Sequence, residues 1–155
     1  MTPARLPRLN WLMTLAGAVI IAVLALEAAW FLRPRAAVTS LDGVDPAQIA
    51  RLEAAWGIRI ANVGVTADGG MVDLRYQVLD ADKALGLTDP EGHPVMVDQA
   101  SGTLIDRGGA HGHGASLRAG STYYMLYLNP AGVLKPGSRV RLQIGEVVLD
   151  NVLVR

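Results

Sequence analysis

Apolar residues recur at every second position over much of the chain after residue 57, which is typical of strands with one buried face. In MVDLRYQVL, residues 71–79, one face carries Val72, Leu74, Tyr76 and Val78, and the other face is polar. RVRLQI, residues 139–144, repeats this alternation. Five further segments are predicted to be strands: GIRIANVGV, HPVMVD, GTLID, STYYMLYLN and EVVLDNVLV.

Turn residues separate these segments, for example Asp68-Gly69-Gly70 and Pro136-Gly137. Many short strands divided by turns predict a mainly β fold, here an antiparallel immunoglobulin-like β-sandwich. A domain of about 100 residues can bury such a core without further support.

A helical period replaces the alternation before residue 57. In DPAQIARLEAAW, Asp45 is placed to cap a helix and Pro46 to occupy its first position. Three apolar residues follow at helical spacing: Ile49, Leu52 and Trp56. A short amphipathic helix is therefore predicted over 46–56, at the start of a domain spanning residues 46–155. DADKALGL, residues 80–87, predicts one more helical turn.

The N-terminal part of the chain contains a long apolar segment. From residue 9 to 32 the only strongly polar side chains are Asn10 and Glu27. As a helix this segment would be roughly 36 Å long, enough for a hydrocarbon core of about 30 Å. The apolar region of a signal peptide is shorter, about 7–15 residues. A transmembrane helix is predicted over 9–32, with a cleaved signal peptide as the alternative.

The arrangement of the remaining segments predicts how the chain is oriented. Residues 1–8 form a short tail, residues 33–45 a linker, and residues 46–155 the large C-terminal domain. A short tail before a single span and a large domain after it is the usual layout of a signal anchor. We therefore expect a single-pass protein of the inner (cytoplasmic) membrane, with residues 1–8 in the cytoplasm and the β domain in the periplasm.

Small residues form one stripe on the predicted span. The stripe consists of Thr14, Ala18, Ala22, Ala25 and Ala29. Small side chains permit close contact between membrane helices, so these residues are predicted to contact an integral membrane protein subunit. Glu27 lies about 160° from Ala29 on a helix, nearly opposite the stripe. It either reaches the headgroup water or meets a second partner or a bound lipid.

The segment TYYMLYL, residues 122–128, is apolar on both faces. Tyr123, Met125 and Tyr127 share one face, and the other carries Tyr124, Leu126 and Leu128. A strand with two apolar faces needs cover on both sides. One face is covered either by the 46–56 helix or by a partner subunit. In the second case Tyr123 and Tyr127 are the candidate contact residues.

The segment GGAHGHGAS, residues 108–116, contains the best candidate metal ligands. His111 and His113 can point to the same side of an extended chain, and imidazole suits copper. Thioether ligands of the type copper accepts are also present in Met71, Met96 and Met125. The alternative is a solvated glycine-rich loop, which holds two ligands too loosely for tight binding, and core packing explains the methionines.

Composition and motifs exclude several functions. The chain has no cysteine, which rules out disulfides, zinc-thiolate sites and cysteine catalysis. Four of its 14 Lys and Arg and one of its 14 Asp and Glu precede residue 36, so the remainder carries a net charge of −3. This acidity argues against nucleic-acid binding. No nucleophile-elbow, zincin or phosphate-loop motif occurs, so we expect a protein without enzymatic activity.

The pattern VDLRYQVLD followed by STYYMLYLNPAGVLKPGSRVRLQIGEVVLDNV resembles a loosely defined group of bacterial proteins with one N-terminal span and a β-sandwich outside the membrane. The resemblance covers roughly residues 57–154 and implies the architecture but no activity. Together these features predict a non-catalytic accessory subunit that stabilises, assembles or docks a larger membrane complex, of the respiratory or photosynthetic type. The alternative is a membrane-tethered periplasmic protein that binds or delivers copper.

Overall fold

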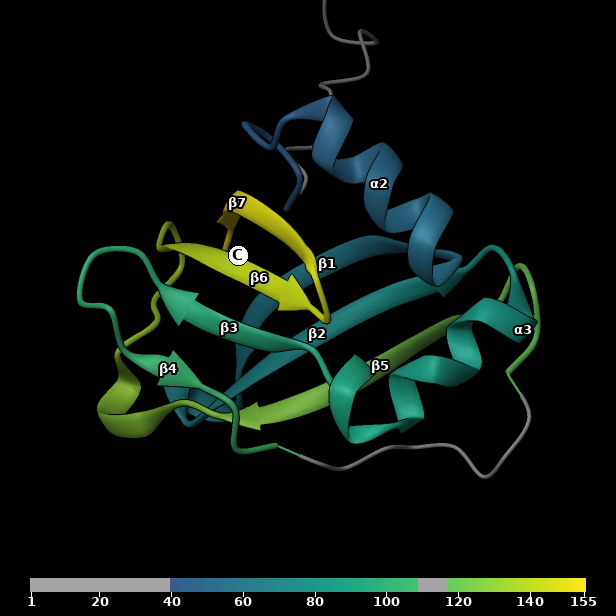
Figure 1. Ribbon diagram of the computed structural model, residues 1–155. Helices are drawn as coiled ribbons and strands as arrows, with labels where there is room; N and C mark the ends of the chain where they lie inside the picture. The colour runs from purple at the N-terminus through teal and green to yellow at the C-terminus, as the bar shows by residue number, and fades with distance from the viewer. Residues whose placement is uncertain (1–39, 109–116) are drawn as a thin grey trace, which may run out of the picture. The chain divides into compact units, whose positions relative to one another are not determined.

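Figure 1 shows the computed structural model of the chain, which describes residues 40–108 and 117–155. Val38–Arg155 form one compact unit. The predicted cytoplasmic tail, the predicted span and most of the linker lie outside the described residues. None of the helices in the described ranges has the length and hydropathy needed to cross a bilayer.

The described part of the chain is mainly β, with two antiparallel sheets. The three-stranded sheet has the order β1-β2-β5 and consists of Ile58–Thr66, Met71–Val78 and Thr122–Leu128. The four-stranded sheet has the order β4-β3-β6-β7, with β3 at Val95–Asp98, β4 at Leu104–Ile105, β6 at Arg139–Ile144 and β7 at Val147–Leu153. All seven predicted strands are confirmed. The two sheets are consistent with a β-sandwich.

The helical predictions are also confirmed. Helix α2 spans Pro46–Trp56, and the carboxylate of Asp45 accepts a hydrogen bond from the backbone N–H of Ala47 at 2.9 Å. It ends at Gly57, whose φ of 60° lies in the left-handed region. A single turn, α3 at Ala81–Ala84, follows β2. Four short 3₁₀ helices complete the described elements: η1 at Ala67–Gly69, η2 at Leu85–Thr88, η3 at Pro90–Gly92 and η4 at Pro130–Gly132.

The core forms where the alternating faces of both sheets meet. The three-stranded sheet contributes the predicted inner face of β2, namely Val72, Leu74, Tyr76 and Val78. The four-stranded sheet contributes Val140, Leu142 and Ile144 of β6, as the alternation predicts. Leu52 of α2 joins the same cluster. Burying these side chains drives the two sheets together.

Backbone hydrogen bonds connect the two sheets along two sides of the domain. On one side, the backbone N–H of Arg155, just after β7, donates to Val63 of β1 at 2.9 Å, and Val65 N–H donates to Arg155 at 2.8 Å. On the other side, residues 106–108 pass from β4 to β5, where Leu128 N–H donates to the carbonyl of Arg107 at 2.7 Å. A Cβ on Gly108 would lie 2.2 Å from the Leu126 carbonyl oxygen, so this crossing requires glycine.

Helix α2 does not cover the outer face of β5, which corrects one of the two sequence-based alternatives. Figure 1 shows α2 over the end of the molecule formed by β1 and β7, and it packs mainly against those two strands and also against α3. On β5, Tyr124 remains 42% exposed and Leu128 54% exposed. The sequence offers the helix as one of two possible covers because TYYMLYL is apolar on both faces, but the helix packs against β1, β7 and α3 instead.

Candidate functional site

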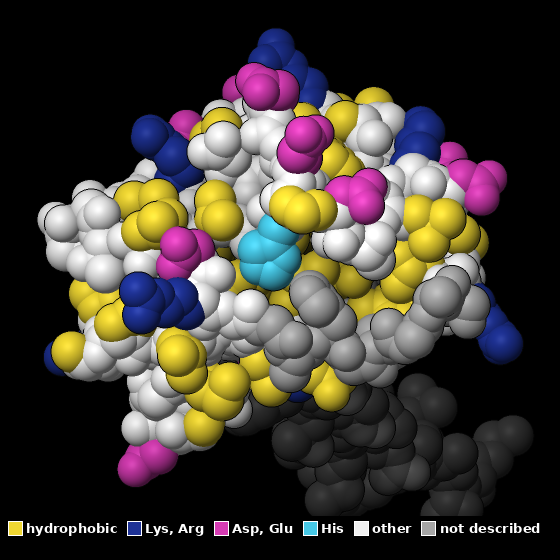
Figure 2. All heavy atoms as spheres, turned by 60° about the horizontal axis from the view of Figure 1, so that its bottom comes forward, with side chains coloured by type: hydrophobic (Ala, Val, Ile, Leu, Met, Phe, Trp, Pro, Cys, Tyr) yellow, Lys and Arg dark blue, Asp and Glu magenta, His cyan; other side chains and the backbone are white. Residues whose placement is uncertain are grey.

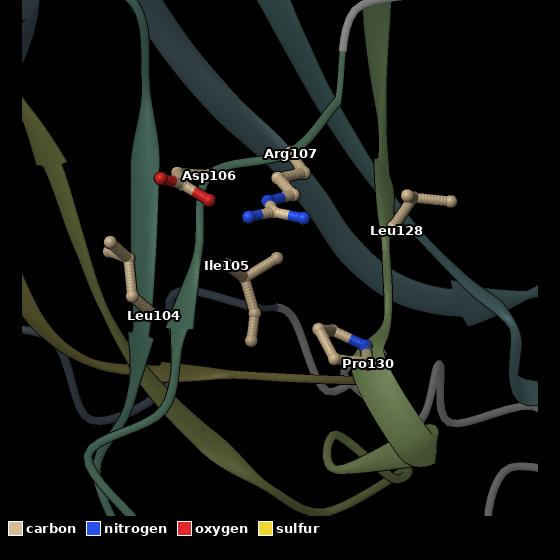
Figure 3. Close-up of a pocket in the computed structure, with 6 residues that line it drawn as sticks. All are labelled: Leu104, Ile105, Asp106, Arg107, Leu128 and Pro130. Carbon is tan, nitrogen blue, oxygen red and sulfur yellow. The ribbon is translucent and has the colours of Figure 1, made fainter.

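A groove lies where the free edge of β4 meets the end of β5. It has a volume of about 380 Å³ and is lined by Leu104, Ile105, Asp106, Arg107, Leu128 and Pro130. Figure 3 shows these residues coming from β4, from the crossing segment after it, from the end of β5 and from the start of η4. Each sheet therefore contributes an edge strand to the groove. We call this site the edge groove.

Four of the six residues that line the edge groove are apolar. Ile105 is buried and belongs to the core, whereas Leu104 is 51% exposed and Leu128 54% exposed. These are the two most exposed large hydrophobic side chains of the described residues. Figure 2, which brings the lower side of Figure 1 forward, shows hydrophobic side chains at the surface between charged ones. Exposed aliphatic side chains around a hollow are typical of a surface that a partner covers.

Two side chains of opposite charge flank this apolar centre. Figure 3 shows the guanidinium of Arg107 directed over the groove, with the carboxylate of Asp106 on the β4 side. The ion pairs found within residues 40–108 and 117–155 involve other side chains. The edge groove thus offers one cation and one anion next to apolar surface, which suits a protein segment better than a small reactive substrate.

Asn129 holds the β5 wall of the edge groove in place. Its Nδ2 donates to the carbonyl of Gly69 and to that of Leu134, each at 2.9 Å. Its Oδ1 accepts from the backbone N–H of Leu134 at 3.0 Å. These bonds join the end of β5 to the β1–β2 turn and to the loop that follows. The positions of Leu128 and Pro130, on either side of Asn129, follow from this buried amide.

The structure places the predicted contact residues Tyr123 and Tyr127 in the core, which corrects their assignment as partner contacts. Tyr127 is fully buried, its hydroxyl donates to the carbonyl of Pro94 at 2.8 Å, and burial raises its pKa. The hydroxyl of Tyr123 accepts from the backbone N–H of Arg118 at 2.9 Å. The accessible face of β5 is the opposite one, which carries Tyr124, Leu126 and Leu128.

The candidate copper ligands are not assembled in the described part of the chain. His111 and His113 lie outside the described residues. Of the methionines, Met96 and Met125 are buried in the core. Residues 40–108 and 117–155 contain no group of three or more His, Cys, Asp or Glu side chains placed to hold a metal ion. Copper binding at the two histidines stays the alternative to a solvated glycine-rich loop.

The predicted contact residues of the span also lie outside the described residues, and they stay predictions: Thr14, Ala18, Ala22, Ala25 and Ala29. Glu27, on the opposite side of the predicted helix, lies outside the described residues as well. Conversely, sequence reasoning missed the edge groove. Leu104 was assigned to a strand, but nothing in GTLID indicates that this strand is short and lies at an edge. The two adjacent charges of Asp106 and Arg107 are the only local signal, and such pairs are common on any surface.

Comparison with protein-family models, with curated proteins and with solved structures found no match. The class that the described residues define is a mainly β protein with two antiparallel sheets and a groove between two edge strands.

Proposed function

We propose that this protein is a non-catalytic accessory subunit, anchored in the inner membrane by residues 9–32, that stabilises, assembles or docks a larger membrane complex. Its β domain lies in the periplasm and engages a partner subunit through the edge groove. The observation that supports this proposal is the groove itself, in which Leu104 and Leu128 are about half exposed beside the opposite charges of Asp106 and Arg107. Respiratory and photosynthetic complexes are the proposed hosts.

The composition of the edge groove supports a protein partner. Interfaces between subunits combine an apolar centre with a polar rim, and here Leu104, Leu128 and Pro130 are flanked by one acid and one base. The groove also runs along the free edge of β4, which pairs only with β3 within its sheet. A sheet edge offers backbone groups to an incoming segment.

The strand order supports the finer classification as an immunoglobulin-like module. β2 and β5 are neighbours in one sheet, whereas β3 and β6 are neighbours in the other. The chain therefore changes sheets after β2, after β4 and after β5, which is the kind of connection found in Greek-key sandwiches. This topology by itself assigns no activity, because unrelated functions share the architecture.

The test is co-purification of the full-length chain with its partners. We expect Leu104→Ser and Leu128→Ser to reduce the recovery of partner subunits several-fold after extraction in mild detergent, as quantified by mass spectrometry. Leu85→Ser is the matched control, because Leu85 is a 45% exposed leucine of η2 outside the groove. Equal recovery from the groove variants and the control would reject the edge groove as the docking site.

A further inference from the structure

The outer face of the three-stranded sheet carries a buried carboxylate oxygen without a hydrogen-bond donor. Asp73 of β2 is only 9% exposed, and its Oδ2 accepts a hydrogen bond from Arg75 Nε at 2.6 Å. Its Oδ1 is buried, and no group in the described ranges donates to it. Leaving a buried acceptor unpaired costs free energy, so such an atom needs an explanation.

The neighbours of Asp73 on this face explain why the oxygen stays unpaired. Directly across the strands lie Gly64 of β1, which has no side chain, and Leu126 of β5, which is apolar. Met71, two residues back along β2, also offers no donor. The amide of Asn62 stands over Gly64 but is not hydrogen-bonded to Asp73.

Hydrogen-bond donors that could pair with such an oxygen lie on the same face, in the guanidinium group of Arg75. Its side chain is 59% exposed, and only its Nε is engaged by a described residue. The remaining guanidinium N–H groups point to no described acceptor. One face therefore combines an acceptor that lacks a donor with donors that lack an acceptor, two residues apart on one strand. Two copies of such a face are complementary to each other.

We propose that two copies of this chain associate face to face through the outer side of the β1-β2-β5 sheet. The twofold axis lies between the two faces, at right angles to β2 and above the midpoint between Asp73 and Arg75, so that Arg75 of each copy reaches the Asp73 of the other. Because Asp73 pairs with Leu126 and Arg75 with Tyr124, the same axis sets Leu126 of one copy against Tyr124 of the second. The side chain of Arg75 swings outward from its own Asp73 as the faces meet. This self-association is separate from docking at the edge groove.

Cross-linking tests the proposed face directly, because the chain has no native cysteine. The full-length Tyr124→Cys variant is treated in native membranes with a short bismaleimide. The control is Gln143→Cys, an exposed position on β6 of the other sheet. We expect several-fold more cross-linked dimer from Tyr124→Cys. Equal cross-linking of the two variants would overturn the proposal.

A charge exchange tests the pairing, in the Tyr124→Cys background. Arg75→Glu alone sets an acid against Asp73 of the second copy, and Asp73→Lys alone sets a lysine against Arg75. We expect either variant alone to cross-link several-fold less than the parent. A mixture of the two chains should cross-link at nearly the parent level, because both contacts are then between opposite charges. A mixture as weak as its components would overturn the proposal.

Two further measurements keep these results decisive. Melting curves establish that each variant is folded. If the Asp73→Lys variant does not fold, the Asp73→Asn variant takes its place. The asparagine variant alone should also cross-link several-fold less, and undiminished cross-linking would overturn the proposal. Leu104→Ser should leave the cross-link unchanged but reduce co-purification of the host complex. The proposal of docking at the edge groove and the proposal of the dimer face can therefore be rejected independently of each other.

Discussion

The buried amide of Asn129 provides the sharpest test of how the edge groove is held. Asn129 is 5% exposed and makes three side-chain hydrogen bonds, with Gly69 and twice with Leu134. Asn129→Ala removes all three at once. It also leaves the backbone N–H of Leu134, itself a buried residue, without the acceptor that it has in the native protein.

The magnitude follows from the number of bonds. A typical intramolecular hydrogen bond contributes about 1 kcal/mol net, so the three bonds together amount to about 3 kcal/mol. For a domain of this size, 1 kcal/mol changes the melting temperature by about 4 °C, so we expect a decrease of about 12 °C. Asn129→Asp should lose at least as much at neutral pH, because a carboxylate oxygen then faces the carbonyls of Gly69 and Leu134.

The assay is denaturant unfolding of the purified full-length chain, followed by near-ultraviolet circular dichroism. Gln99→Ala, which removes an exposed amide, is the control and should change the free energy of unfolding by less than about 0.5 kcal/mol. A loss below about 1 kcal/mol for Asn129→Ala would refute the reasoning, since it would mean that water replaces these bonds at little cost. The reasoning would also be refuted if the Asn129→Asp variant were as stable as the native protein.

Three other predictions concern pH, copper and the membrane. The hydroxyl of Ser101 donates to Asp98 at 2.6 Å, and this hydrogen bond lowers the pKa of Asp98. Ser101→Ala should therefore cost about 1.5 kcal/mol of unfolding free energy above about pH 4, a difference that shrinks as the pH falls through the lowered pKa of Asp98. His111→Ala with His113→Ala should leave stability and complex membership unchanged. Calorimetric copper binding at sub-micromolar affinity, lost in that double variant, would instead favour the copper alternative. Residues 9–32 should keep the protein in the membrane pellet after alkaline carbonate washing, and release into the supernatant would contradict the anchor.

The elements of this fold could be predicted because their signals are local. The alternation in β2 and β6 marks their buried faces before any tertiary contact is known. Asp45, Pro46 and Gly57 mark the ends of α2 through side-chain capping and backbone preference, which act within one turn of the chain. Helix α3 is marked in the same way by Asp80, whose carboxylate accepts from the backbone N–H of Asp82 at 3.1 Å.

The candidate site could not be predicted in this way. The edge groove requires that β4 and β5 lie at the edges of different sheets, and edge position depends on the strands with which they pair. Asn129 shows the same limit, because its partners include Gly69, which lies 60 residues earlier in the chain. No local pattern distinguishes this asparagine from one in an exposed turn.

The sequence by itself determined which segments are strands and helices, where the turns lie, and that one long apolar segment precedes the β domain. Only the tertiary structure decided which face of β5 is buried. Both of its faces are apolar, so the period-two pattern favours neither, and the choice depends on which face meets the four-stranded sheet. That choice buried Tyr123 and Tyr127 and left Tyr124 and Leu128 exposed. The physical reason is that burial is a property of packed layers, whereas periodicity is a property of a single strand.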